Sequence, residues 1–213
     1  MTIQATPTQH RISDALYGSL RAWVHDYIDT KCIVRDTTMP GKRPGSQYQW
    51  MFYLRRGLFN PRFLISISQM FIYHMERLDP KLNFQITGLE TAATPMLTAI
   101  TLVAGELHAD INAFVVRKER KEYGLLNMFE GLPNHKVAVM LDDLCNSSNS
   151  LAKCYWRLRE EDIPVAEVAF VLVNKVNSTH AESRARTDLQ LPDSIKVISL
   201  FTLDDFELSN PSH

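Results

Sequence analysis

The stretch Val137–Leu151, VAVMLDDLCNSSNSL, gives the strongest indication of the fold. Its apolar start, Val137–Leu141, has the length and composition of a strand buried on both faces of a sheet. Two acidic residues, Asp142 and Asp143, follow, and a loop of small polar residues then leads into a helical pattern over Ser148–Glu160. A buried strand, a polar loop and a helix in this order predict one unit of an α/β fold.

The same alternation of strand and helix extends on both sides of this stretch. Further apolar runs of strand length are Phe84–Thr87, Ala113–Val116, Val168–Val173 and Val197–Leu200. Helical patterns cover Pro61–Arg77 and Thr94–Leu107, and the first of them starts with an Asn-Pro pair that suits a helix N-terminus. The pattern predicts a doubly wound, mainly parallel sheet with helices on both faces. Ligands of such sheets bind at the carboxyl ends of the strands.

The composition is that of a globular protein of one domain. The chain has 213 residues, of which 45% are hydrophobic, and its formal net charge is −1. A chain of this length can form a core of ordinary size. A net charge close to zero provides no overall attraction to nucleic acid or to a membrane surface, so an anion site has to be a local basic cluster. We therefore expect no nucleic-acid partner and no membrane partner.

We expect neither a signal peptide nor a disulfide framework. The first residues, MTIQATPTQHRISDAL, show no charged start followed by an apolar run, and no apolar stretch is long enough to span a bilayer. Cys32, Cys145 and Cys154 lack the spacing of a metal site, and their odd number does not suggest paired disulfides. A reduced, cytoplasmic setting follows as the expectation.

The two carboxylates after the central strand are the first candidate for chemistry. Asp142 and Asp143 can hold a sugar diol and a hydrated magnesium ion. The backbone N–H groups of the loop after them, together with the N-terminus of the next helix, can hold a phosphate. The alternative is that both acids only cap a helix or face water.

A basic stretch is the second candidate. In AFVVRKERKEYG, Ala113–Gly124, a buried strand leads into four cations within five positions, namely Arg117, Lys118, Arg120 and Lys121. Such a cluster suits a polyphosphate better than a single carboxylate. Because Glu119 and Glu122 are interleaved, the stretch can equally be a solvated charged turn.

A turn of small residues is the third candidate. In FQITGLETAATPMLTA, Phe84–Ala99, a strand leads through small side chains into a helix that starts near Thr94 and Pro95. Small side chains allow a ligand to approach the backbone closely. The alternative is tight packing between the strand and the helix.

In this order, the three candidates resemble the corresponding segments of the type I phosphoribosyltransferases, and most closely those of the orotate phosphoribosyltransferases. The matching stretches are Gly57–Asn60, Gly88–Pro95, Arg117–Gly124, Val137–Leu151 and Lys196–Leu203. In turn they are similar to the family's N-terminal region, its pyrophosphate loop, its mobile catalytic loop, its acidic strand end with the phosphate loop, and its last strand. The resemblance covers roughly residues 45–206.

The resemblance implies a fold and a reaction. The fold is the doubly wound type I phosphoribosyltransferase fold, with a small N-terminal hood in residues 1–60 and a core in residues 61–213, one structural domain overall. The reaction is transfer of the ribosyl-5-phosphate group from 5-phosphoribosyl-1-pyrophosphate (PRPP) to orotate, a nucleobase-like acceptor, with Mg²⁺ as cofactor and release of pyrophosphate. The family further implies a homodimer in which the mobile loop reaches the neighbour's site.

Roles for individual residues also follow from the resemblance. Asp142, Asp143 and Lys121 would be the catalytic residues, and the two acids would hold Mg²⁺ indirectly, through ribose or water. PRPP and pyrophosphate contacts would come from Arg117, Lys118, Lys121, Glu90, Thr91, Ala92, Asn146, Ser147, Ser148, Asn149 and Ser150. The acceptor base would contact Lys175 and Tyr53.

Several positions depart from the family's pattern. Ser148 stands where the phosphate loop carries glycine, and a serine with positive φ would cost on the order of 1 kcal/mol or more. Tyr123 stands where the mobile loop carries histidine. On the acceptor side, Gln49 replaces a lysine and Lys175 replaces an arginine, so a cation is lost and a bidentate contact becomes monodentate. Charge could instead come from Lys42, Arg43, Arg55 or Arg56, while Trp50 is interpreted as a packing residue.

Two alternatives to orotate transfer remain open from the sequence. In the first, the acceptor is a different base. In the second, the chain is a regulatory protein that binds PRPP or a nucleotide without turnover. The altered phosphate loop favours the regulatory protein, whereas the retained Asp142, Asp143 and basic cluster favour an enzyme.

Overall fold

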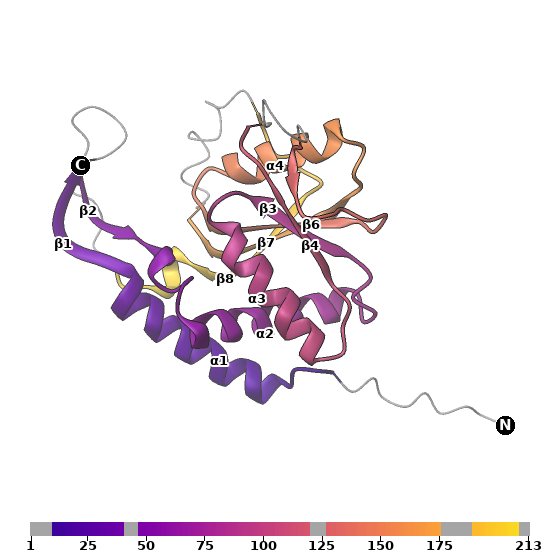
Figure 1. Cartoon of the computed structure of the whole chain (residues 1–213). Coiled ribbons are helices and arrows are strands. Elements are labelled where there is room, and N and C mark those ends of the chain that lie inside the picture. Colours follow the sequence, from indigo (N-terminus) through magenta and orange to yellow (C-terminus); the bar gives the residue numbers. More distant parts are fainter. Residues whose placement is uncertain (1–9, 41–46, 120–126, 176–188, 209–213) are drawn as a thin grey trace.

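The computed structural model describes residues 10–40, 47–119, 127–175 and 189–208, and the core of the fold is a six-stranded sheet (Figure 1). The strand order is β5-β4-β3-β6-β7-β8. The strands are β3 (Gln85–Leu89), β4 (Asn112–Val116), β5 (Phe129–Glu130), β6 (Ala138–Cys145), β7 (Val165–Asn174) and β8 (Lys196–Thr202). All neighbours pair in parallel except the short β5, which is antiparallel to β4. The predicted α/β class and the five predicted strands are confirmed.

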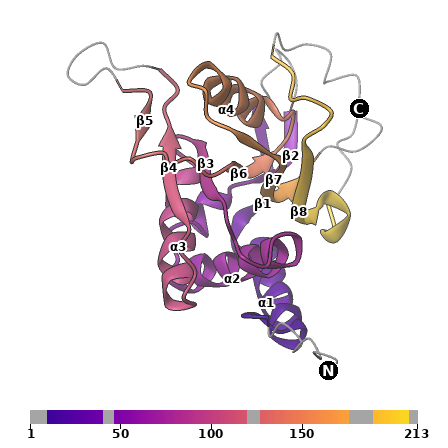
Figure 2. The ribbon, with the colours of Figure 1, turned by 90° about the vertical axis from the view of Figure 1, so that its right-hand side faces the viewer.

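Helices cover both faces of this sheet, as the doubly wound pattern requires. On one face lie α2 (Pro61–Leu78) and α3 (Ala93–Glu106), and on the other lies α4 (Asn149–Glu160), an arrangement that Figure 2 shows from the side. Successive residues of β6 face opposite cores: Val139 and Leu141 pack on the α2–α3 side, whereas Met140 packs against α4. This two-sided burial explains why the strand reads as a continuous apolar run.

The N-terminus of α2 forms as its sequence indicates. Asn60 is the N-cap, and its side-chain oxygen accepts a hydrogen bond of 3.0 Å from the backbone N–H of Phe63. Pro61 occupies the first turn, where its missing N–H costs nothing. The helix then buries Phe71, whose ring lies edge-on to Phe170 of β7 with centroids 5.0 Å apart. This contact fixes α2 against the centre of the sheet.

The residues before α2 form a helix and a hairpin whose elements the sequence did not define. Helix α1 (Asp14–Tyr27) continues into a π-helical turn, η1 (Ile28–Cys32), and packs on α2. Strands β1 (Ile33–Pro40) and β2 (Gln47–Phe52) then form an antiparallel hairpin that projects from one side of the molecule in Figure 1. A single 3-10 turn, η2 (Leu54–Arg56), follows. The predicted division at residue 60 stays a prediction, and side chains from both sides of it share one core.

The connection from β7 to β8 differs from the others. Residues 189–195, the described part of this connection, contain no helix. They run over the α4 face, where the indole N–H of Trp156 donates to the carbonyl of Gln190 at 3.1 Å and Leu191 and Ile195 pack with α4. The predicted loop at residues 177–188 lies outside the described residues. No helix in the described ranges has the length and apolar character needed to cross a membrane.

Candidate active site

A cavity of about 490 Å³ lies at the carboxyl ends of β3, β6 and β7, where the sequence directs attention. It is lined by Trp50, Met51, Phe52, Arg55, Leu89, Glu90, Thr91, Ala92, Lys118, Asp142, Asp143, Leu144, Asn146, Ser147, Ser148, Asn149, Ser150 and Lys175. The wall therefore joins the acidic strand, the phosphate loop, the pyrophosphate loop and the start of the basic stretch. The cavity also has a wall from Trp50, Met51 and Phe52, in the region that the resemblance assigns to the acceptor base.

The acidic pair lies in the wall of this cavity, with Asp142 buried and Asp143 half-buried. Strand β6 continues through Asp142 and Asp143 and ends two residues later at Cys145, so the backbone of both acids is held by strand pairing. A carboxylate oxygen of Asp142 accepts a hydrogen bond from the backbone N–H of Asp143 at 2.9 Å. Burial, reinforced by the neighbouring Asp143, raises the pKa of Asp142 to about 7. Burial also raises the pKa of Asp143.

Two adjacent carboxylates create a demand for positive charge or hydrogen-bond donors. Both lose hydration, and the charge of Asp143 further disfavours ionisation of Asp142. A ligand that brings hydroxyl donors and a cation relieves both costs. These electrostatics would suit a sugar diol with a bound cation, and that role of the pair stays a prediction.

The phosphate loop, Asn146–Ser150, connects β6 to α4. Ser148 is the N-cap of α4, with φ of 57° and ψ of 9°, which is the left-handed region that favours glycine. The strain expected from a serine at the glycine position is confirmed, and it falls on Ser148 rather than on Asn146 or Asn149. The carbonyl of Ser148 accepts a hydrogen bond from the N–H of Ala152 at 2.8 Å, so the loop is fixed to the first turn of the helix. All five loop residues line the cavity.

In the pyrophosphate loop, some of the small residues serve tight packing and others line the cavity. A Cβ atom on Gly88 would lie 2.5 Å from the carbonyl oxygen of Leu141 and against the Cβ of Ala93, so this glycine serves tight strand–helix packing. Glu90, Thr91 and Ala92 instead line the cavity. Packing therefore explains the first residue of the loop, and ligand access explains the next part.

The basic stretch divides in the structure. Lys118 lines the cavity, and its backbone N–H donates to a carboxylate oxygen of Glu90 at 2.9 Å. Arg117, predicted as a pyrophosphate contact, does not line it; its guanidinium pairs with Glu130 of β5 at 2.6 Å. The reason is that the antiparallel pairing of β5 with β4 brings Glu130 next to the end of β4. The predicted catalytic Lys121 lies outside the described residues, as do Arg120 and Tyr123.

The acceptor side is formed by Lys175 and the hairpin. The ammonium of Lys175 lies 5.0 Å from the ring centroid of Trp50 and 6.0 Å from that of Phe52. Burial lowers the pKa of Lys175 below the usual value for lysine. Trp50 is thus a wall of the cavity and a cation–π partner, in addition to the packing role read from the sequence.

Tyr53, the second predicted acceptor contact, does not line the cavity. Its backbone N–H donates to the carbonyl of Cys32 at 2.6 Å, and its exposed ring lies 5.4 Å from the guanidinium of Arg56. The rings beside the Lys175 ammonium are those of Trp50 and Phe52, and the assignment of Tyr53 to the acceptor stays a prediction. Gln49 also does not line the cavity.

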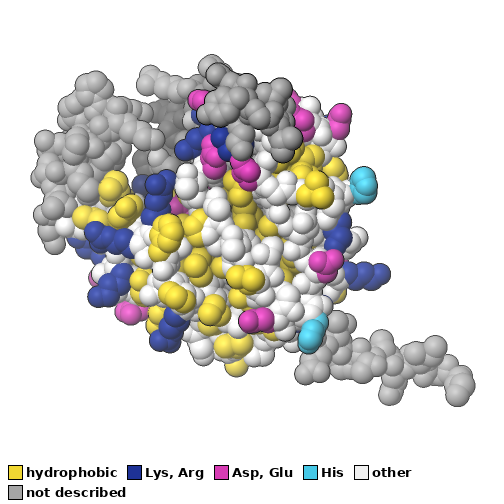
Figure 3. All heavy atoms as spheres, viewed as in Figure 1, with side chains coloured by type: hydrophobic (Ala, Val, Ile, Leu, Met, Phe, Trp, Pro, Cys, Tyr) yellow, Lys and Arg dark blue, Asp and Glu magenta, His cyan; other side chains and the backbone are white. Residues whose placement is uncertain are grey.

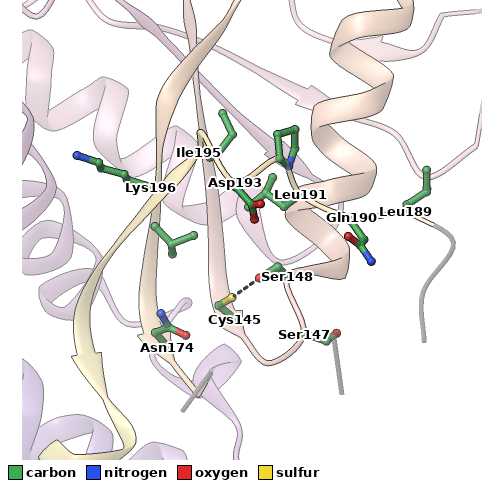
Figure 4. Close-up of a pocket in the computed structure, with 12 residues that line it drawn as sticks. Cys145, Ser147, Ser148, Asn174, Leu189, Gln190, Leu191, Asp193, Ile195 and Lys196 are labelled. Atoms are coloured by element: carbon green, nitrogen blue, oxygen red, sulfur yellow. Dashed lines mark hydrogen bonds between the residues drawn. The ribbon is translucent and has the colours of Figure 1, made fainter. Parts of the chain in front are cut away.

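A second cavity, of about 390 Å³, lies on the other side of the phosphate loop (Figure 4). It shares Ser147 and Ser148 with the first, and its other polar residues include Asn174, Gln190 and Asp193. The thiol of Cys145 and the hydroxyl of Ser148 lie 3.3 Å apart in its wall, as the dashed line in Figure 4 marks. Because this cavity lacks the acidic pair, the larger cavity is the candidate active site.

The sheet order, the acidic pair in β6, the phosphate loop before α4 and the pyrophosphate loop after β3 define a protein with the type I phosphoribosyltransferase fold. Comparison with solved structures agrees. Orotate phosphoribosyltransferase from Mycobacterium tuberculosis superposes with a TM-score of 0.68 over 89% of this chain and 99% of that chain, at 21% identity. Adenine phosphoribosyltransferase from Trypanosoma brucei gives a TM-score of 0.59 over 91% of this chain and 85% of that chain, at 12% identity.

Sequence comparison narrows the relationship. Orotate phosphoribosyltransferase from Thermosynechococcus vestitus is 27% identical over 165 residues, which cover 76% of this chain and 81% of that protein. No family model matches the sequence. The solved structures show that the chain has the type I phosphoribosyltransferase fold, and the sequence relatives support its assignment to this family of pentosyltransferase enzymes.

Proposed function

We propose that the protein transfers the ribosyl-5-phosphate group of PRPP to orotate and releases pyrophosphate. The observation that carries the proposal is a single cavity whose wall holds the acidic pair and most of the predicted PRPP residues together with Lys175. The relatives named orotate phosphoribosyltransferase support the choice of acceptor, and so does the charge of that end.

The PRPP end of the cavity offers partners for each part of this substrate. The backbone of Asn146–Ser150 and the N-terminus of α4 suit the 5-phosphate, because unpaired N–H groups and the helix dipole favour an anion there. Asp142 and Asp143 suit the ribose hydroxyls, which can donate to carboxylates. Thr91, Ala92 and Lys118 suit the pyrophosphate, whose negative charge increases as the bond to ribose breaks.

Magnesium fits this arrangement as a cofactor held partly by the substrate. Asp142 and Asp143 are the acidic pair that would hold it, since both are carboxylates on the cavity wall. The described residues contain no cluster of three or more His, Cys, Asp or Glu side chains suited to a metal ion, so the remaining ligands would be PRPP oxygens and water. When bound, the ion would neutralise charge on the pyrophosphate.

At the acceptor end, the protein's residues would orient the base. The cation of Lys175 would attract the carboxylate of orotate, and the wall formed by Trp50 and Phe52 would exclude water. A ring nitrogen of the acceptor could then face the anomeric carbon of the ribose above Asp142 and Asp143. The new carbon–nitrogen bond forms as the bond to pyrophosphate breaks. The electron pair leaves on the pyrophosphate oxygen, and the proton of the acceptor nitrogen passes to the pyrophosphate or to water.

We also propose that the protein forms a homodimer. Large apolar side chains are exposed on and beside α2 and α3, with Phe59 at 79% and Leu102 at 67% exposure. Figure 3 shows hydrophobic side chains spread over this face of the molecule. Such an accumulation favours contact with another protein surface. Sedimentation of the wild type and of a Leu102→Glu variant tests the proposal, and a wild type that sediments as a monomer at all concentrations contradicts it.

The decisive test of the reaction is pyrophosphate release from PRPP, measured with a panel of acceptors. The panel contains orotate, uracil, adenine, and a control without acceptor. Release that requires both orotate and magnesium supports the proposal. Pyrophosphate release with uracil or adenine, but not with orotate, would identify a different acceptor. PRPP binding without release with any base indicates a regulatory protein.

A further inference from the structure

We propose that Arg55 is a specificity-determining residue of the acceptor site, where its guanidinium binds the anionic group of the acceptor together with the ammonium of Lys175. This inference rests on the proposed function and deepens it by assigning the selection of a carboxylate-bearing acceptor to a residue of the hairpin side. The two cations reach the cavity from different elements: Arg55 from η2 and Lys175 from the end of β7.

The position of Arg55 is the first argument. It follows β2 directly, in the 3-10 turn Leu54–Arg56, and it lines the same cavity as Asp143 and Lys175. Its positive charge is felt at the acidic pair, because it lowers the pKa of Asp143 against the larger effect of burial. Among the described residues no carboxylate forms an ion pair with Arg55. The guanidinium is therefore available to a ligand in the cavity.

The adjacent Arg56 shows that this placement is specific. The Arg56 guanidinium donates to the carbonyl of Lys31 at 3.2 Å and lies 5.4 Å from the ring centroid of Tyr53. It does not line the cavity. The side chains of these two adjacent arginines thus lie in different surroundings, and of the two only Arg55 lines the cavity.

The distribution of charge decides which ligand group Arg55 meets. The cations on the described wall are Arg55, Lys118 and Lys175. Lys118 lies beside Glu90 of the pyrophosphate loop, so it belongs to the pyrophosphate end. Arg55 and Lys175 belong to the side of the hairpin and β7, where PRPP has no phosphate left to offer once its two ends occupy the phosphate and pyrophosphate loops.

A neutral base would leave the half-buried ammonium of Lys175 without an anionic partner, and it would offer no acceptor charge to the exposed guanidinium of Arg55. The ammonium of Lys175 is already partly desolvated and faces the rings of Trp50 and Phe52. A carboxylate restores the lost hydration energy, and the planar guanidinium of Arg55 can pair with it through two parallel hydrogen bonds. The site is thus built for a planar heterocycle that carries a carboxylate, and against the same ring without one.

The test compares Arg55→Met with Arg56→Met, a matched control that removes the same group one residue away. Orotate and uracil are the probes, because they differ by the carboxylate. For Arg55→Met we expect the KM for orotate to rise by roughly ten- to a hundredfold, because one charge-assisted contact is lost. The Kd for PRPP should change by less than about twofold. Arg55→Lys should give an intermediate KM, and Arg56→Met should resemble the wild type.

Two results would overturn the inference. One is an unchanged orotate KM in Arg55→Met, and the other is a Kd for PRPP that rises as much as the KM, which would assign Arg55 to pyrophosphate. If the wild type does not turn over orotate, the proposed function fails. Calorimetric binding of orotate and uracil still tests whether Arg55 binds the carboxylate. Wild-type binding of orotate in preference to uracil that is lost in Arg55→Met upholds the inference, whereas equal binding of both probes, or loss of neither, refutes it.

Discussion

The two ends of the cavity are built in different ways. The PRPP end consists mostly of residues at the carboxyl ends of sheet strands, and its acidic pair and phosphate loop come from one continuous stretch, Asp142–Ser150. The acceptor end combines β2, η2 and the residue after β7, which are far apart in the sequence. The first end is a property of one strand–loop–helix unit. The second exists only when the hairpin is placed against the sheet, so its chemistry can change without altering the core.

The difference also appears in the electrostatics. At the PRPP end two carboxylates lie side by side, and burial raises the pKa of both. At the acceptor end burial lowers the pKa of Lys175. In both cases the folded protein removes a charged side chain from water, which costs hydration free energy. A bound group of opposite charge offsets that loss. Under the proposed function, the acidic pair would favour hydroxyl donors and a cation such as Mg²⁺, whereas Lys175 would favour an anionic group of the acceptor.

The largest expected effect comes from removing the acidic pair. The double variant Asp142→Asn with Asp143→Asn should lose magnesium-dependent PRPP binding and lower the rate of pyrophosphate release by at least about a hundredfold, the scale seen when a group that stabilises developing charge is removed. Isothermal calorimetry and a pyrophosphate assay measure the two effects. Circular dichroism serves as a check that the fold survives. An unchanged calorimetric affinity would show that the PRPP end lies elsewhere.

A smaller effect is expected at the other end. Lys175→Ala should raise the KM for orotate by roughly ten- to a hundredfold and leave PRPP binding intact, since only an acceptor contact is lost. The wild-type KM should also rise as pH increases through the lowered pKa of Lys175, because the neutral amine no longer attracts a carboxylate. Lys175→Arg is the matched variant. Its guanidinium stays charged, so its KM should not rise with pH in this range.

If Lys175→Ala weakens PRPP as strongly as orotate, the separation into two ends is wrong. A wild-type KM that stays constant up to the ordinary pKa of lysine would show that Lys175 is hydrated rather than buried.

The third prediction concerns stability at the PRPP end. The pKa of Asp142 is about 7 in the folded protein and near 4 in the unfolded chain, so between these values the folded state binds more protons. The free energy of unfolding should therefore fall as pH rises through this window. Asp142→Asn removes the effect and should be more stable than the wild type above about pH 7, by on the order of 1–3 kcal/mol.

Urea denaturation of both proteins at a series of pH values measures this difference. The two stabilities should converge near pH 4, where Asp142 is protonated in both states. A difference that does not depend on pH would mean that the substitution acts through packing rather than through charge.

Much of the core could be predicted from the sequence because its signals are local. Val137–Leu141 is apolar at every position because both faces of β6 are covered, and Asn60-Pro61 forms the expected helix start. The acidic pair and the phosphate loop follow from their places after this strand. These features depend on residues that are neighbours in the chain.

The acceptor end could not be predicted as well, for physical reasons. Trp50 and Phe52 face Lys175 only because β2 pairs with β1 and the hairpin lies over the sheet, and nothing in the residues themselves distinguishes Trp50 from a packing residue. The place of Tyr53 outside the cavity wall has the same origin, because Tyr53 lies at the junction between β2 and η2. Arg55 and Arg56 are chemically identical in the sequence, and only the η2 turn separates them.

The smallest expected effect tests whether the PRPP end carries avoidable strain. Ser148 adopts φ of 57°, where glycine has no Cβ penalty, and Ser148→Gly should therefore relieve about 1 kcal/mol and raise Tm by about 2–4 °C. Part of this gain is offset by the lost contact between the Ser148 hydroxyl and the Cys145 thiol. Ser148→Ala separates the two contributions, because alanine keeps the strain and loses the contact, so it should be less stable than the glycine variant. PRPP affinity should improve by a few-fold at most in Ser148→Gly, since the loop backbone already has the conformation that the helix N-terminus requires. A glycine variant that melts below both the wild type and Ser148→Ala would show that the serine hydroxyl, rather than backbone freedom, determines the stability of the phosphate loop.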